Sequence, residues 1–335
     1  MQLPRADKTS GMPRSRVPPF KLIRSRLAQV RKLINQQLTS PAKDRAVGQL
    51  LDYMNARSGK MIRPGLVLLS AGAVGKTTDK HIRIAAIVEM IHNATLLHDD
   101  VIDEGQQRRG LATINRLWGN ESAVLLGDFL LSRVFKMCAD LEPKIIGIIA
   151  AAAARTCEGE LRQIIQRRNW RLSEPEYIDI ITEKSAIFLS SCCRLGAFLA
   201  GAGKADVESL ARFGLNAGIA FQITDDLLDI TGDENQTGKT SGRDADRNKL
   251  TLAVIHLLRA VARSQKAKVY DKLNAVGKDK RALTKMLRSY GSLEYAHSRA
   301  QEYVALAIGA LAKLPESDAK KALIETAKFM AGRTV

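Results

Sequence analysis

The chain has 335 residues, of which 45% are hydrophobic and only 5% aromatic, and its formal net charge is +17. This length allows one large domain or two ordinary ones, and no apolar run is long enough to predict a membrane-spanning helix. The four cysteines lack the spacing of a metal site, and the first 20 residues lack the apolar stretch of a secretory signal. The composition therefore favours a cytoplasmic protein with a helical core.

The positive charge is concentrated near the N-terminus, where residues 1–63 contain 14 Lys or Arg and 3 Asp or Glu. Such a segment suits nucleic acid, an anionic membrane surface or a polyanionic substrate. No nucleic-acid recognition motif is present and no aromatic residues interleave with the cations, so we expect no nucleic-acid partner. We expect residues 1–18 to form a disordered basic arm, and one hypothesis is that it holds the protein at an anionic membrane surface.

Apolar residues recur at helical spacing along most of the chain. A capping box at Ser173 and Glu176, with Pro175 in the first turn, predicts one helix start. No segment alternates with the period of a strand, and no internal linker is rich in Gly, Pro or Ser. We therefore predict a single all-α domain over residues 19–335, with helices at 20–38, 46–54, 81–103, 119–139, 143–168, 176–201, 206–230, 248–263, 280–290, 293–313 and 318–331.

Two stretches of the form D-D-x-x-D follow strongly apolar segments. The first is Asp99-Asp100-Val101-Ile102-Asp103, and the second is Asp225-Asp226-Leu227-Leu228-Asp229. On a helix the first and last aspartates of each stretch lie on one face. Like charges this close together are costly to bury unless cations neutralise them. Oxygen ligands without nearby Cys or His favour Mg²⁺, which binds through a few carboxylates and substrate phosphates.

Basic residues accompany the acidic stretches. They are Lys60 and Arg63 in GKMIRP, Arg108 and Arg109 after the first stretch, Lys184 in an apolar helix, and Lys239 and Lys249 after the second. Each one alone is typical of a solvated surface charge, except for Lys184. Taken together with the six aspartates, they predict a cavity for a polyphosphate, with metals on one side and Arg and Lys on the others.

The segments GKMIRP, ATLLHDDVIDEGQQRRG, EKSA, FQITDDLLDITGD, TGK and NKLTL occur in an order that resembles the trans-isoprenyl diphosphate synthases. The resemblance covers about residues 20–335 and is strongest to bacterial octaprenyl-type polyprenyl synthases. Terpene cyclases share the first acidic motif but have a different second one. The chain departs from the family pattern at Met61, where a basic residue is usual, and at Ser185, where Thr is commoner.

The resemblance implies an isoprenoid-synthase helical bundle that acts as a homodimer and binds Mg²⁺, with three ions per active site when substrate is bound. It implies head-to-tail condensation of isopentenyl diphosphate with an allylic diphosphate to give a long all-trans polyprenyl diphosphate, a precursor of quinone side chains. The implied metal ligands are Asp99, Asp100, Asp103, Asp225, Asp226 and Asp229. The implied catalytic set is Asp99, Asp100, Asp103, Lys184, Asp225 and Lys239.

The resemblance also implies two substrate sites. The allylic diphosphate would contact Arg108, Lys184 and Lys239, with Lys249 nearby. Ser185 and Gln222 would orient the reacting centre. Isopentenyl diphosphate would be held by Gly59, Lys60, Arg63, His92 and Arg109, although a lone His on an apolar helix, as at position 92, is often only a core residue.

Product length is predicted from the helix that precedes Asp99. Helical spacing places Thr95 and Ile91 on the same face as Asp99. In the family, bulky aromatic residues four or five positions before the motif stop chain growth, but this chain has the small Ala94 and Thr95 there. We therefore expect a product of about six to ten isoprene units by family likeness, with Phe129 and Phe135 as a possible deeper floor.

Three alternatives remain open at this point. A medium-chain geranylgeranyl diphosphate synthase would use the same residues and stop earlier. A terpene or squalene-type enzyme would share the ionisation step but would not require isopentenyl diphosphate. A non-catalytic partner subunit would retain the fold, although such subunits tend to lose the carboxylates that are intact here.

Overall fold

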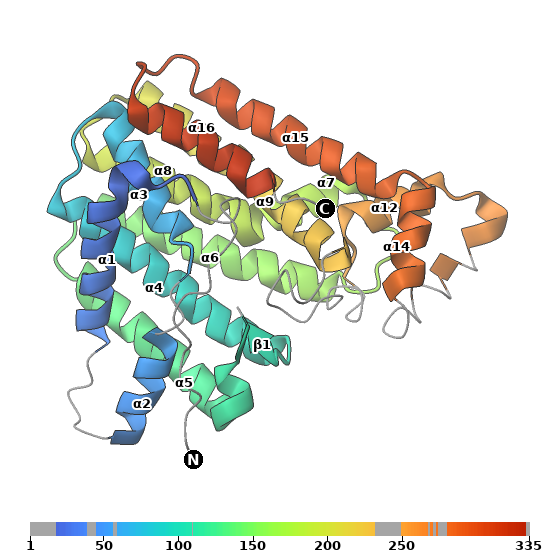
Figure 1. The fold of residues 1–335 in the computed structure, drawn as a ribbon, viewed down its shortest axis with the longest axis horizontal. Helices are drawn as coiled ribbons and strands as arrows, with labels where there is room; N and C mark the ends of the chain where they lie inside the picture. The colour runs from blue at the N-terminus through green and yellow to red at the C-terminus, as the bar shows by residue number, and fades with distance from the viewer. Residues whose placement is uncertain are drawn as a thin grey trace.

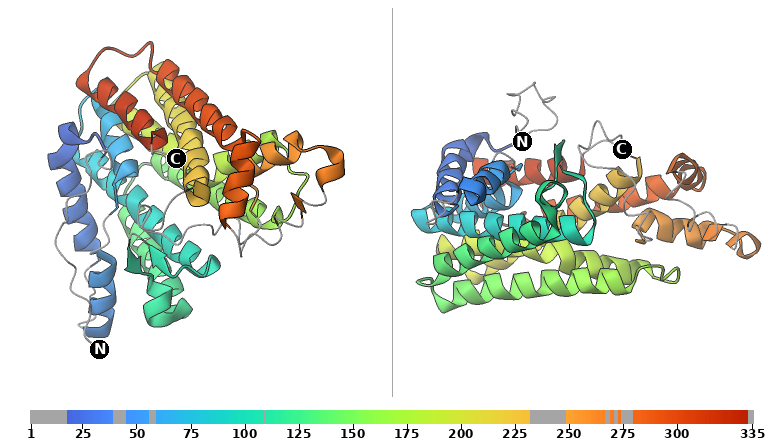
Figure 2. Two further views of the ribbon diagram at one scale, coloured as in Figure 1. Left: turned by 45° about the vertical axis from the view of Figure 1, so that its right-hand side comes forward. Right: turned by 90° about the horizontal axis from the view of Figure 1, so that it is seen from below.

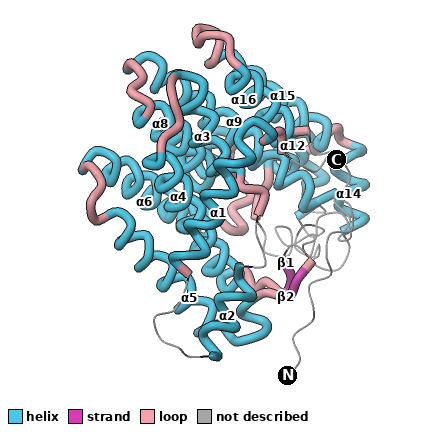
Figure 3. The backbone as a smooth tube through the Cα atoms, turned by 60° about the vertical axis from the view of Figure 1, so that its left-hand side comes forward, coloured by secondary structure: helices cyan, strands magenta, loops and turns pink. Residues whose placement is uncertain are grey.

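The structure is a computed structural model that describes residues 18–38, 45–55, 59–108, 110–231, 249–266, 269, 270, 273 and 280–332. In this part of the chain, strand occurs only in an antiparallel pair, β1 (Gln107–Arg108) and β2 (Leu111–Ala112), and helices dominate (Figure 3). The all-α prediction is confirmed. Of the predicted basic arm, all but Pro18 lies outside the described residues.

The N-terminal part contains a 3₁₀ turn η2 (Lys21–Ile23) and the helices α1 (Arg24–Gln37), α2 (Arg45–Asn55) and α3 (Ile62–Val74). The sequence did not predict α3. Pro64 lies in the first turn of α3, where a helix tolerates proline. Because α3 is buried on nearly every side, it also lacks the amphipathic period that marks a surface helix.

Helices α4 (Asp79–Ile102) and α5 (Ile114–Cys138) pack side by side (Figure 1). Thr78 and His81 form a capping box at the start of α4. The predicted helix at 119–139 begins earlier in the structure, because two helical pieces meet at Gly119, whose φ of 86° breaks the regular backbone. The β1–β2 hairpin lies between the two helices in the chain and therefore close to the first acidic motif.

The predicted helix at 176–201 is three elements in the structure. After α6 (Pro143–Ile165) come α7 (Glu174–Ile181), a π-helical segment η3 (Thr182–Ala186) and α8 (Ile187–Leu199). The capping box at the start of α7 is present, since the backbone N–H of Ser173 donates to Glu176 at 2.7 Å and the Glu176 N–H donates to the Ser173 hydroxyl at 3.4 Å. Segments of π-helix are rare and frequently mark functional sites.

The central helix is α9 (Lys204–Thr231), which packs against α8 and α15 (Ser292–Ala310) and also contacts α16 (Asp318–Ala331). The remaining elements are α12 (Leu252–Ala260), η4 (Arg263–Gln265) and α14 (Lys280–Ser289). Figure 2 shows α5 and α6 along one side of the bundle and α15 and α16 away from them. No helix in the described ranges is long and apolar enough to cross a membrane.

Buried apolar side chains form two clusters, and α9 belongs to both. Its N-terminal half, with Leu210 and Phe213, packs with α3, α4 and α8. Its C-terminal half, with Ile223 and Leu227, packs with α7, α12 and α15. The second acidic motif therefore lies on a helix that both clusters fix in place.

Candidate active site

The first acidic motif lies at the C-terminal end of α4, and the second lies near the end of α9. Arg63, at the start of α3, is close enough to Glu89 of α4 and to Asp225 of α9 for their charges to act on it. Burial is the larger effect and lowers the pKa of Arg63, while the two carboxylates raise it. The structure thus brings charged residues of α3, α4 and α9 close to one another.

Asp100 is the buried member of the first motif, with a side chain that is 4% exposed. The Arg108 guanidinium neutralises it, because Nε donates to the two carboxylate oxygens at 2.9 and 3.1 Å and Nη2 lies 2.9 Å from Oδ1. The Asn115 side chain donates to the backbone carbonyls of Asp100 and Gly105, each at 3.1 Å, and so ties the end of α4 to the hairpin. Arg108 is therefore fixed beside the motif by a bidentate pair.

Asp103 ends α4 and faces cations from two other segments. Arg167, which follows α6, lies 3.8 Å from one carboxylate oxygen, and Lys249 lies 3.7 Å from the other. The Lys249 side chain is mostly buried. Lys249, which follows the second motif in the sequence, thus lies close to the first motif.

The Asp99 carboxylate makes no hydrogen bond or ion pair within the described residues, in contrast to the carboxylates of Asp100 and Asp103. The pKa of Asp99 is raised to about 6, chiefly by loss of solvation and then by the nearby Glu160 carboxylate, against the opposing effects of Lys184 and Arg108. A poorly solvated carboxylate without a hydrogen-bonded partner is costly for the protein. Its position is therefore suited to a cation that arrives with substrate.

Lys184 comes from the π-helical segment η3 and lies in reach of α6. Its Nζ is 2.7 Å from Oε1 of Glu160 and donates to Oε1 of Gln163 at 2.8 Å. The two partners are three residues apart on α6, so they present their side chains on one face. Neither residue was predicted from the sequence, because only the packing of α6 on η3 brings them to Lys184.

Two glycines allow η3 to lie very close to its neighbours. A Cβ atom on Gly159 of α6 would lie 2.8 Å from the Cα of Lys184, and closer still to the Lys184 backbone nitrogen. A Cβ atom on Gly218 of α9 would lie 2.6 Å from the Cα of Ala186. The backbone that presents Lys184 and Ser185 is therefore held between two helices at positions where only glycine fits.

The second acidic motif is supported by a buried chain of hydrogen bonds. The Tyr177 hydroxyl donates to Oδ2 of Asp226 at 2.6 Å, and the Gln222 amide donates to Oδ1 at 2.8 Å. The Ser185 hydroxyl in turn donates to Oε1 of Gln222 at 2.6 Å. These contacts give Asp226 a supporting role, whereas Asp225 and Asp229 are only half-buried on the same helix.

Three of the predicted isopentenyl diphosphate residues, Gly59, Lys60 and Arg63, lie around the start of α3. Lys60 Nζ is 5.2 Å from the ring centre of Phe329 in α16, and the Arg63 guanidinium is 5.9 Å from the ring centre of Phe188 in α8. Met61, the departure from the family pattern, has a φ of 54° and is buried, so it shapes this turn rather than facing an anion.

A cavity of about 80 Å³ opens next to this turn, between α1, α2 and α4. It is lined by Gly59, Met61, Glu89, Asn93, Asp100 and Arg108, among others. His92, a half-buried residue of α4, neighbours Asn93 in the sequence, and its backbone carbonyl accepts a hydrogen bond from Thr95 at 2.9 Å. The cavity places Gly59 and the first acidic motif on one continuous surface.

The residues predicted to set product length lie inside the bundle. Ala94 and Ile91 are buried, and Thr95 is half-buried. Phe135, proposed from the sequence as a deeper floor, is 72% exposed on α5 and does not face the interior of the chain. That expectation was wrong, because α5 turns one apolar face away from α4. Phe129 is half-buried beneath Arg133.

The donor atoms of the site are suited to Mg²⁺. In the described ranges no three His, Cys, Asp or Glu side chains are gathered closely enough to hold an ion by themselves. Mg²⁺ commonly binds through one or two carboxylates together with substrate phosphates. The half-buried Asp99 carboxylate, without an ion pair in the described part of the chain, fits such an ion. Arg109 and Lys239, both predicted site residues, lie outside the described residues.

Comparison with known proteins gives the family. Residues 44–290 match the polyprenyl synthetase family. The chain belongs to the polyprenyl synthetase family. This family assignment confirms the resemblance inferred from the sequence motifs, and it covers both acidic motifs, η3 and the start of α3.

Relatives in the polyprenyl synthetase family cover nearly the whole chain. Octaprenyl diphosphate synthase from Escherichia coli is 35% identical over 311 residues, which are 92% of this chain and 95% of that protein. Geranylgeranyl diphosphate synthase from Methanosarcina mazei is 31% identical, with 84% and 88% covered. The crystal structure of a Caulobacter crescentus polyprenyl synthase, complexed with calcium and isoprenyl diphosphate, has a TM-score of 0.88, 32% identity and coverage of 94% and 97%.

Proposed function

We propose that the protein is a Mg²⁺-dependent prenyltransferase that condenses isopentenyl diphosphate head-to-tail with an allylic diphosphate, giving a long all-trans polyprenyl diphosphate. One observation carries the proposal: the half-buried Asp99 carboxylate, which has no ion pair within the described residues, lies near Lys184 and Arg108, in a family whose Caulobacter member was crystallised with calcium and isoprenyl diphosphate. The named products of the relatives, including octaprenyl diphosphate, support chain elongation as the reaction.

The allylic diphosphate would lie between the two acidic motifs. Asp99 and Asp103 from α4 and Asp225 from α9 would hold Mg²⁺, with three ions per site as the finer proposal. The bound ions supply positive charge for the departing pyrophosphate. Lys184 and Arg108 provide further positive charge at the same oxygens, so the C–O bond ionises to an allylic cation.

Isopentenyl diphosphate would lie against the start of α3, held by Gly59, Lys60, Arg63 and His92. Gly59 lines the small cavity beside the first motif, and Lys60 follows it directly in the chain. From there the double bond of isopentenyl diphosphate attacks the allylic cation and a proton is lost to the released pyrophosphate. Ser185 and Gln222, joined by a 2.6 Å hydrogen bond, orient the reacting centre from η3 and α9.

A long product is supported by the small side chains Ala94 and Thr95 before the first motif. An aromatic residue at either position would fill the space that a growing tail needs. A product of geranylgeranyl length is the alternative, because the Methanosarcina relative carries that name at 31% identity. The quinone side chain is the proposed use of a longer product.

Incubation of the purified enzyme with Mg²⁺, farnesyl diphosphate and radiolabelled isopentenyl diphosphate tests the function. We expect products longer than 20 carbons, which disappear when EDTA removes the metal. A product formed without isopentenyl diphosphate would indicate a terpene or squalene-type enzyme. The absence of any metal-dependent product would indicate a non-catalytic subunit and overturn the proposal.

We propose that the partner is a second copy of the chain, which packs on an apolar face formed by α5 and α6. Four large apolar side chains on this face are more than half exposed: Leu125 at 67%, Phe135 at 72%, Leu161 at 59% and Ile165 at 76%. Exposed patches of this kind mark interaction surfaces. Replacing Leu125 and Phe135 with Lys is expected to shift the protein from dimer to monomer in analytical ultracentrifugation, and a double variant that stays dimeric would contradict this.

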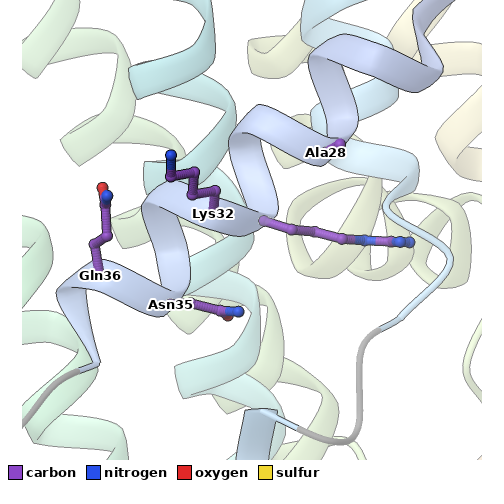
Figure 4. A pocket seen from close by; sticks show the side chains of 5 residues that line it. Ala28, Lys32, Asn35 and Gln36 are labelled. Carbon is purple, nitrogen blue, oxygen red and sulfur yellow. The ribbon is translucent and has the colours of Figure 1, made fainter.

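We also propose peripheral contact with an anionic membrane, where an apolar product is delivered. From residue 18 to residue 38 the chain contains no acidic residue, and Lys21, Arg24, Arg31 and Lys32 are exposed. Figure 4 shows Lys32 on the outer face of α1, beside Ala28, Asn35 and Gln36. Removal of residues 1–18, with α1 kept, is expected to weaken co-sedimentation with vesicles of anionic lipid, and unaltered binding would contradict a role for the arm.

We also propose that residues 19–335 form one domain.

A further inference from the structure

In the described part of the chain, the cations close to the first acidic motif are paired with carboxylates. Arg108 is paired with Asp100, and Lys249 lies 3.7 Å from Asp103. Lys184 differs from these two, because the carboxylate closest to it among the described ion pairs belongs to neither motif. It contacts Glu160 of α6, a residue with no assigned role in the reaction, at 2.7 Å.

The contact between Lys184 and Glu160 is well defined. Gln163 accepts a second hydrogen bond from the same Nζ at 2.8 Å, so two side chains of α6 hold the ammonium group. Both charged side chains are less than a third exposed. Gly159, the residue before Glu160, lets the backbone of η3 approach α6 closely enough for this contact. Glu160 is also near enough to Asp99 for their like charges to interact.

We propose that Glu160 is a positioning residue. Its carboxylate binds Lys184 until substrate arrives, and so occupies the role that the diphosphate takes when it is bound. The inference rests on the proposed role of Lys184 as a diphosphate contact. An ammonium group has three N–H donors but no preferred direction, so it exchanges partners readily. On binding, diphosphate oxygens replace the Glu160 carboxylate, and the paired charges prevent an isolated ammonium group at the empty site.

This exchange makes Glu160 a competitor of the substrate. Removing its charge while keeping its shape should therefore tighten the binding of a diphosphate. A carboxylate that instead served the metal ions directly would have the opposite effect, because its removal would weaken metal-dependent binding. Whether removal of the Glu160 charge tightens or weakens diphosphate binding therefore distinguishes the two roles.

The test is calorimetric binding of inorganic pyrophosphate in the presence of Mg²⁺, which needs no turnover. We expect Glu160→Gln to bind pyrophosphate about three- to tenfold more tightly than the wild type, the order expected for loss of a part-exposed ion pair. Glu158→Gln on the same helix is the matched control, since Glu158 is exposed, and should bind like the wild type. Lys184→Gln should bind at least about tenfold more weakly.

The double variant Glu160→Gln/Lys184→Gln shows whether Glu160 acts through Lys184. We expect the gain from Glu160→Gln to fall below about twofold in this background. Weaker or unchanged binding by Glu160→Gln overturns the inference, and so does a gain that persists without Lys184. If Lys184→Gln binds normally, the diphosphate role of Lys184 fails as well, which separates that failure from a failure of Glu160 alone.

Steady-state kinetics add a readout that a purely structural role would not change. For Glu160→Gln we expect the KM for the allylic diphosphate to fall while kcat stays within about twofold. Thermal unfolding confirms that the variant folds, and Glu160→Ala serves as a second variant with the same expected direction of binding. A fall in kcat with unchanged KM in both variants would contradict the exchange of partners.

Discussion

Gly159→Ala is expected to displace Lys184, the proposed diphosphate contact, without changing its side chain. The added Cβ would lie 2.8 Å from the Cα of Lys184 and 2.9 Å from the carbonyl carbon of Glu183, and still closer to the Lys184 nitrogen. These are backbone atoms, so the whole η3 segment must move by several tenths of an ångström or more. Overpacking of this kind costs about 1–3 kcal/mol, offset by about 1 kcal/mol from the better helix propensity of alanine.

The free energy of unfolding should therefore fall by roughly 0–2 kcal/mol, a modest change for a protein of this size. The effect on catalysis should be larger, because misplacement of a charged group by about 1 Å can reduce the rate by up to about 100-fold. Urea unfolding gives the stability, and the elongation assay gives kcat/KM for the allylic substrate. We expect at least about a tenfold loss in kcat/KM.

Gly147→Ala on the same helix is the matched control. A Cβ at Gly147 would meet no atom within 4 Å, so only the helix propensity changes. This variant should keep its activity and gain roughly 0.5–1 kcal/mol in stability. If Gly159→Ala retained wild-type kcat/KM while folding normally, the close packing of η3 on α6 would not position Lys184, and the reasoning would be refuted.

Three further substitutions test the site. Arg108→Gln leaves the buried Asp100 without its partner and should lower the unfolding free energy of the metal-free protein by about 3 kcal/mol, whereas the exposed Arg116 tolerates the same change; equal urea midpoints for the two variants would contradict this. Tyr177→Phe removes a buried hydrogen bond to the second acidic motif and should cost about 1.5–3 kcal/mol in urea unfolding, so an unchanged midpoint would show that the bond contributes nothing. Ala94→Phe should shorten the product in a radiolabelled chain-length assay, and products of wild-type length from the folded variant would count against a tail that runs along α4.

The sequence predicted most helices because their apolar residues recur at helical spacing. Helix α3 was missed since it is buried on nearly every side and so lacks a polar face. The start of α5 was placed too late because Gly119 interrupts the helix with a left-handed backbone. The single predicted helix at 176–201 became three elements, since η3 depends on close packing against Gly159 and Gly218 rather than on local propensity.

The candidate site was predicted from charge patterns, and its supporting contacts were not. Aspartates at helical spacing after apolar segments can be recognised from the sequence alone. Glu160 and Tyr177 carry no such signal, because Lys184 and Asp226 reach them only through tertiary packing. The exposed Phe135 was assigned to the interior for the same reason, since the sequence does not reveal which apolar face of α5 meets α4.

A crystal structure with Mn²⁺ in place of Mg²⁺ and a non-reactive allylic diphosphate analogue tests the two acidic motifs most directly. Anomalous scattering locates the ions without reference to the protein. We expect metal between the diphosphate and the carboxylates of Asp99 and Asp103 on one side and Asp225 on the other, with Lys184 Nζ turned from Glu160 to the diphosphate. Ions bound away from both motifs, or a diphosphate that binds with none, would contradict the proposed site.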